Sequence, residues 1–157
     1  MLKNTELRRQ AGVINDLLTR TPAATGGDIE LQAHWARYIC VLAAGFLENA
    51  LFEIYAAVIR VGANPTVASF AASRLEKLTN PKSSRFIETA RAFRPEWADD
   101  LETFLTDDGR RDAIDSIMAN RHQIAHGERS GITIARLRQF FERSVAVVEF
   151  LEKQCGT

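Results

Sequence analysis

The stretch Ile29–Val61, IELQAHWARYICVLAAGFLENALFEIYAAVIRV, decides the fold of this chain, because it reads as one long helix. Its apolar residues form two stripes at helical spacing, so protein is predicted to cover much of its circumference. One stripe consists of Trp35, Ile39, Leu42, Phe46 and Ala50, and the other of Val41, Ala44, Phe52, Tyr55 and Ile59. Gly45 lowers the helix propensity, and the close approach of a second helix is one reason for a glycine there. We therefore expect this helix to be the central element of the fold.

Helical periodicity also runs through the sequence on both sides of this stretch, without strand-like alternation. The expected helices besides the central one cover residues 4–20, 66–78, 81–93, 95–105, 112–125 and 134–153. Residues 21–27 are predicted to form a loop, with Asp28 as the N-cap of the long helix. Pro65 ends that helix, because proline cannot continue it, and Pro81 suits a first helical turn. The sequence thus predicts an all-α fold, an antiparallel helical bundle with additional short helices, in a single domain of residues 1–157.

The charges of the chain cancel overall but are unevenly placed. Twenty basic and twenty acidic residues give a formal net charge of zero, which counts against strong nonspecific binding of nucleic acid. Residues 96–108 carry six acids and no base, whereas residues 121–143 carry five arginines against Glu128 and Glu142. A neutral chain can therefore still present a local basic site.

The two cysteines and the first residues indicate the compartment. Cys40 lies in an apolar helical run and is predicted to be a buried free thiol, while Cys155 is expected in a frayed tail, so no disulfide is expected. Residues 1–6 lack the hydrophobic region of a signal peptide, and no run of 18 residues is free of charge. We therefore expect a cytoplasmic protein without membrane association.

The segment Asn120–Gly127, NRHQIAHG, is the strongest candidate for chemistry, because it holds two of the three histidines beside an arginine. The guanidinium of Arg121 has the planar donors that clamp a phosphate. Histidine exchanges protons near neutral pH, which makes His126 and His122 candidates for acid–base work. Together these groups are the minimum needed to cut a phosphodiester without a metal or another cofactor.

The spacing within this segment leaves two arrangements open. Arg121 falls in an apolar helical stripe, where a guanidinium needs an anion, a structural ion pair or a route to water. His126 lies five positions later, about 140° around an ideal helix, so one regular helix directs the two groups apart. Either the helix ends before His126, as Gly127 suggests, or a second copy of the chain supplies the missing group.

Two further features bear on the site. Glu48 lies among apolar residues of the long helix, so it is predicted to be buried and paired with an arginine, either Arg121 or Arg37. His122 and His126 are four residues apart, a spacing that can bind a transition metal. A third ligand would have to come from His34, Cys40 or a carboxylate, and no recognisable motif supplies one, so no metal is expected.

The segment from Arg121 to His126 resembles the Arg-x4-6-His motif of the HEPN superfamily of α-helical ribonucleases and RNA-binding domains, with His122 as the polar residue that follows the arginine. Arg37–Glu48 looks like the early long helix of the RiboL-PSP-HEPN branch. The resemblance covers most of the chain. It implies a helical bundle of the HEPN type and a homodimer in which the two motifs line one cleft. The surplus apolar face of Ile29–Val61 and the divergence of Arg121 and His126 predict that the interface is formed largely by the long helix and the motif helix.

The resemblance also implies a function, a metal-independent endoribonuclease in which Arg121 holds the scissile phosphate and His126 transfers protons. His122, Asn120 and Glu48 would support the site or touch the RNA. Such a protein would be a prokaryotic toxin or antiviral effector, restrained by an antitoxin or another regulatory partner. Glu128 stands where some HEPN toxins carry a tyrosine that a partner enzyme modifies, so that mode of neutralisation is not expected here. The alternative is a noncatalytic HEPN-like module for RNA binding or dimerisation.

Overall fold

Seven helices and no strand make up residues 1–156, the part of the chain that the computed structural model describes. The helices are α1 (Thr5–Ala24), α2 (Ile29–Gly62), α3 (Pro65–Leu75), α4 (Ser83–Phe93), α5 (Pro95–Thr106), α6 (Arg110–Ala125) and α7 (Ile134–Cys155). The all-α helical bundle predicted from the sequence is confirmed.

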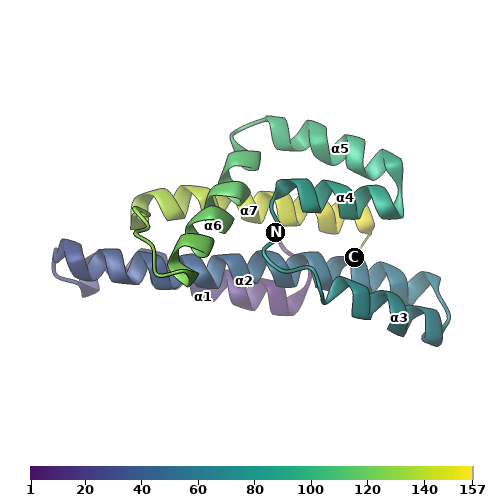
Figure 1. Cartoon of the computed structure of the whole chain (residues 1–157), viewed down its shortest axis with the longest axis horizontal. Helices are drawn as coiled ribbons and strands as arrows, with labels where there is room; N and C mark the ends of the chain where they lie inside the picture. Colours follow the sequence, from purple (N-terminus) through teal and green to yellow (C-terminus); the bar gives the residue numbers. More distant parts are fainter. Residues whose placement is uncertain (157) are drawn as a thin grey trace.

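Helix α2 is the central element, because α1, α3, α6 and α7 all pack against it. Figure 1 shows α1, α2 and α7 along the long axis of the molecule, with α6 crossing toward the N-terminal half of α2. By length and composition alone α2 is apolar enough to cross a membrane. However, 61% of its apolar window is buried inside the bundle, which is what a central helix requires.

One side of α2 remains open in its N-terminal half, although much of its circumference is covered as predicted. Trp35, Tyr38 and Val41 are 38%, 53% and 41% exposed. Gly45 is also exposed, and no atom lies within 4 Å of the position that a Cβ would take there. A close approach within the chain is therefore not the reason for this glycine.

Helix α1 continues to Ala24, so the loop predicted for residues 21–27 begins later than expected. Pro22 lies inside the last turn of α1, where it lacks the N–H group that would bond to the carbonyl of Leu18. The guanidinium of Arg138, on α7, donates a hydrogen bond to that carbonyl at 2.7 Å. A side chain from another helix thus replaces the bond that the proline cannot make.

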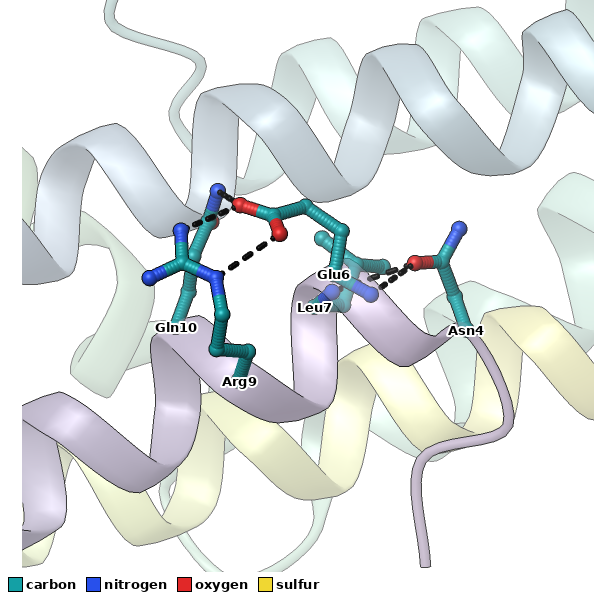
Figure 2. Close-up of polar contacts among 5 residues, drawn as sticks. All are labelled: Asn4, Glu6, Leu7, Arg9 and Gln10. Atoms are coloured by element: carbon teal, nitrogen blue, oxygen red, sulfur yellow. Dashed lines mark hydrogen bonds and ion pairs between the residues drawn. The ribbon is translucent and has the colours of Figure 1, made fainter.

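The first turn of α1 is fixed by a local network, shown in Figure 2. The side-chain oxygen of Asn4 accepts hydrogen bonds from the backbone N–H groups of Glu6 and Leu7, at 2.9 and 3.1 Å. The Glu6 carboxylate accepts hydrogen bonds from Arg9, at 2.9 and 2.6 Å, and from Gln10, at 2.9 Å. These donors lower the pKa of Glu6 to about 2.

Two carboxylates hold the segment between α3 and α4. Glu48 of α2 accepts a hydrogen bond from the backbone N–H of Asn80 at 2.5 Å. Asp115 of α6 accepts hydrogen bonds from the backbone N–H and the hydroxyl of Ser83, at 2.7 and 2.9 Å. Helix α4 begins at Ser83, so Pro81 precedes it instead of lying in its first turn, and α3 ends at Leu75, three residues earlier than predicted.

The two cysteines are free thiols. Cys40 is fully buried, as predicted. Cys155 is not in a frayed tail but is the last residue of α7 and partly buried. Burial raises the pKa of each thiol to about 12.

Candidate functional site

The motif helix α6 ends in a Schellman motif. Gly127 has a φ of +70°, a conformation that glycine adopts at little cost, and lies directly after the C-cap His126. The N–H of Gly127 bonds to the carbonyl of Ile124 at 3.1 Å, and the N–H of Glu128 bonds to that of Gln123 at 2.9 Å. This is the pair of bonds that satisfies the last carbonyls of a helix. The glycine therefore ends α6 as predicted: the last residue of the helix is Ala125, and His126 is its C-cap.

As the C-cap, His126 nevertheless stays in the helical register. Its N–H bonds to the carbonyl of His122 at 3.1 Å, the bond expected of a residue that continues the helix. The rings of His122 and His126 lie with their centroids 4.3 Å apart, and both residues are exposed. Because a helix places Arg121 about 140° away from His126, the helix end does not turn the two groups toward each other.

Asn120 holds the loop that follows α6. Its amide donates to the carbonyl of Ser116 at 2.8 Å, and its side-chain oxygen accepts from the hydroxyl of Ser130 at 2.7 Å. The same hydroxyl accepts from the N–H of Ile132 at 3.4 Å. The amide of Asn120 therefore ties the loop to the helix, and Ser130 is a supporting residue that the sequence did not single out.

Two sets of contacts show how α6 is placed along α2. The thiol of Cys40 lies 3.6 Å from the carbonyl oxygen of Ile117. Farther along α2, Glu48 binds the same α3–α4 segment that Asp115 binds from the N-terminal half of α6. The two helices therefore run in opposite directions at this contact, so residues later in α6 lie beside residues earlier in α2. Arg121, one turn beyond Ile117, lies toward the N-terminal half of α2.

Two half-buried arginines near this contact lack a partner. Residues 1–156 contain five half-buried arginines, namely Arg37, Arg110, Arg121, Arg138 and Arg143. Arg110 and Arg138 donate to backbone carbonyls, and Arg143 pairs with Asp108 at 3.7 Å. Within the described chain, Arg37 and Arg121 form neither a hydrogen bond nor an ion pair, and the Nε of Arg37 is buried without an acceptor.

These two arginines lie on the same side of the Cys40–Ile117 contact. Arg37 is one turn before Cys40 on α2, and Arg121 is one turn after Ile117 on α6. Partly desolvated positive charge without a carboxylate is costly in the free protein, and an anionic ligand would relieve that cost. The structural ion pair considered for Arg121 is absent from residues 1–156. The packing of α6 on α2 brings Arg37 to the same side of this contact as Arg121. The positions of the two residues in the sequence did not reveal this.

The prediction that Glu48 pairs with an arginine is wrong. Glu48 is half-buried, and its carboxylate binds the backbone of Asn80 instead. The reason is its position: Glu48 follows Arg37 by eleven residues of α2, about 16 Å of helical rise, and lies on the opposite side of the Cys40 contact from Arg121. Glu48 therefore supports the α3–α4 segment and not the motif.

The motif offers few side chains that could bind a metal ion. Among residues 1–156, no group of three histidine, cysteine or acidic side chains gathers at one place. The histidine pair at the end of α6 thus has no third protein ligand from its own chain. His34 and Cys40, the ligands considered from the sequence, do not join it.

The chain is thus an all-α domain with an arginine and a histidine at the end of one helix. The chain belongs to the RiboL-PSP-HEPN family, whose model it matches over residues 6–157. No curated protein and no solved structure matches it. Membership of this family indicates a function related to RNA.

Proposed function

We propose that this protein is a metal-independent endoribonuclease. The observation that carries the proposal is the unneutralised pair Arg37 and Arg121, with the exposed His126 at the end of the helix that holds Arg121, within a family related to RNA. An RNA strand supplies the missing anion, its phosphate, and the 2'-hydroxyl that a proton-transfer group can activate. Asn120 and His122 support this site by holding the loop and the His126 ring.

The reaction needs only groups that the protein and the RNA supply. His126 takes the proton of the attacking 2'-hydroxyl or gives one to the leaving 5'-oxygen. The 2'-oxygen forms a bond to phosphorus while the bond to the 5'-oxygen breaks, leaving a 2',3'-cyclic phosphate and a 5'-hydroxyl. Arg121 binds the phosphate oxygens and stabilises the charge that develops on them.

We further propose that two copies form one catalytic unit. In a single chain Arg121 and His126 point apart, because His126 keeps the helical register. A homodimer formed largely through α2 and α6 would let the arginine of one copy and the histidine of the other approach one phosphate. HEPN domains commonly dimerise, and a closed dimer with twofold symmetry would contain two such composite sites.

The biological setting that fits this activity is a cytoplasmic toxin or antiviral effector restrained by a regulatory protein. Uncontrolled cleavage of RNA damages the cell that makes the enzyme, so such an activity requires an inhibitor or an activating signal. Glu128, the second residue after His126, offers no hydroxyl for modification. Modification of a tyrosine at this position is therefore not available, and we propose a regulatory protein that acts by binding.

The test is cleavage of a single-stranded RNA by the wild type and by the variants Arg121→Ala and His126→Ala. Each variant should lose about 10²–10⁴-fold in rate, as is typical when a general acid or base is removed, while its melting temperature stays close to that of the wild type. Arg60→Ala is the matched control, because Arg60 is exposed at the far end of α2. Chelator should not change the rate, and a 2'-deoxy substitution at the cut should block it.

Mixing the two inactive variants tests the composite site. Random exchange makes half of the dimers mixed, and each mixed dimer has one intact site of two, so about a quarter of the wild-type rate should return. No recovery in a demonstrated mixed dimer would assign both groups to one copy. RNA binding without any cleavage by the wild type would identify a noncatalytic HEPN-like module instead.

A further inference from the structure

An aromatic hollow lies on the open side of α2, one turn from Arg37. His34, Trp35 and Tyr38 line this hollow, which has a volume of about 280 Å³. The rings of Trp35 and Tyr38 meet edge to face, with centroids 5.7 Å apart. In this arrangement the two rings present surfaces of different orientation, and both residues are exposed.

The charges of α2 nearest the hollow are Arg37, three residues after His34, and Glu30, four residues before it. His34 is three residues before Arg37 and four before Tyr38, and these are the spacings at which side chains become neighbours on a helix. From Leu31 to Leu47, α2 carries no carboxylate. The guanidinium of Arg37, which has no partner in residues 1–156, is therefore the nearest strong charge on this helix.

The hollow lies close to the motif along the helix axes. Tyr38 precedes Cys40 by two residues and Trp35 precedes it by five, which corresponds to about 3 and 8 Å along α2. Arg121 follows Ile117, the residue in contact with Cys40, by about 6 Å along α6. The rises are short, but Tyr38 and Trp35 lie about 160° and 140° around α2 from Cys40, so the hollow faces away from α6. An RNA strand that joins the hollow to Arg121 would pass over Arg37, which lies between them at about 60° from Cys40.

We propose that this part of α2 is a nucleotide subsite of the ribonuclease, which takes an unpaired base of single-stranded RNA on Trp35 and Tyr38 and the adjoining phosphate on Arg37. The assignment rests on the proposed function and names its substrate class. Bases stack on exposed aromatic rings with little dependence on sequence. Bases in a duplex are already paired and stacked, so double-stranded RNA should not enter the subsite.

The charge of the surface favours RNA over a second copy as its occupant. A twofold contact between copies brings the same patch of each copy together. A twofold contact would add a second unpaired Arg37 to the first, with Glu30 of each copy as the one carboxylate of α2 near the hollow. A phosphate backbone carries the opposite charge. The subsite therefore requires that Trp35 and Tyr38 stay outside the contact between copies.

Tryptophan fluorescence tests the contact directly. The chain has two tryptophans, Trp35 and Trp97, so Trp97→Phe leaves Trp35 as the only reporter. Adding His126→Ala prevents cleavage during the titration. A single-stranded oligonucleotide should quench the fluorescence of Trp35, and a duplex of the same sequence should not. Binding seen by filter retention with unchanged fluorescence would overturn the subsite.

Substitutions then measure the contribution of each group. Trp35→Ala and Tyr38→Ala should each raise the dissociation constant for single-stranded RNA about 10-fold. Arg37→Gln should weaken binding and lower the salt dependence of log K by about 0.7, the value of one phosphate contact on a single strand. Phe70→Ala, which removes a 62% exposed ring on α3, is the matched control and should leave binding unchanged.

The outcomes separate the subsite from the catalytic proposal. Cleavage and binding that survive both aromatic substitutions would refute the subsite and leave the ribonuclease intact. Conversion of dimers to monomers by Trp35→Ala in light scattering would make this face an interface between copies and refute the subsite. Quenching of Trp35 by RNA that the wild type does not cut would support the subsite and refute catalysis. Absence of any RNA binding by the wild type would refute both.

Discussion

Replacing Arg138 should destabilise the protein through the end of α1, because its guanidinium occupies the carbonyl that Pro22 leaves without a donor. The carbonyl of Leu18 accepts from Arg138 at 2.7 Å, and Leu18 is 1% exposed. Arg138→Met keeps an apolar stem but removes the donors. A hydrogen bond from a charged group contributes about 1.5–3 kcal/mol, and the half-buried guanidinium sets our expectation near 2 kcal/mol. For a chain of this size the melting temperature should fall by about 4–8 °C.

The stated cause can be isolated with a second substitution. Pro22→Ala restores an N–H that can bond to the carbonyl of Leu18, so Arg138→Met should cost only about 0.5–1 kcal/mol in that background. The coupling between the two positions is measured from chemical denaturation of the four proteins in the cycle. Arg136→Met is the control, since Arg136 is exposed and makes no hydrogen bond to α1. Equal costs in both backgrounds, within about 0.5 kcal/mol, would refute the reasoning.

Three further predictions concern the first turn of α1, the motif loop and the buried thiol. The pKa of Glu6 is lowered from 4.5 to about 2. The contribution of its carboxylate to stability is therefore present above pH 4.5 and lost as the pH falls toward 2. The melting temperatures of Glu6→Gln and the wild type should converge as the pH falls through this range. Ser130→Ala removes the partner of Asn120, so amide exchange in the loop of residues 126–133 should quicken and the proposed RNA cleavage slow, whereas Ser69→Ala on the exposed face of α3 should change neither. Burial holds the pKa of Cys40 near 12, so this thiol should react with a thiol reagent at pH 8 only after unfolding, and fast labelling of Cys40 in the native protein would contradict its placement.

The sequence was sufficient to predict helices wherever local patterns and caps determine them. The long central helix and the end of α6 at Gly127 follow from periodicity and from a glycine that tolerates a positive φ. The end of α1 does not, because Pro22 is a helix breaker in isolation and is accommodated only through Arg138 of α7. No pattern near residue 22 contains that information.

Side-chain partners across helices were the less predictable part of the site. Glu48 met the criteria for a buried ion pair, but its carboxylate found the backbone of Asn80, which the turn between α3 and α4 brings to it. The open side of α2 includes Trp35 and Val41, which belong to the apolar stripes from which coverage of much of the helix was predicted. Apolar character shows that a surface favours contact, but not whether the contact is made within the chain, with another copy or with a ligand.

The absence of a partner for Arg37 and Arg121 is the property of the site that only the folded chain reveals. In sequence each arginine has an acid seven residues away, Glu30 for Arg37 and Glu128 for Arg121. In the structure none of these carboxylates approaches either guanidinium within ion-pair distance across residues 1–156, although three other half-buried arginines have acceptors. Charge left uncompensated at two residues of adjacent helices is expensive for a scaffold, and it is useful to a protein that binds an anion between them. For this reason we propose that the end of α6 and the adjoining turns of α2 form one RNA-binding surface, with His126, the proposed proton-transfer group, at its edge.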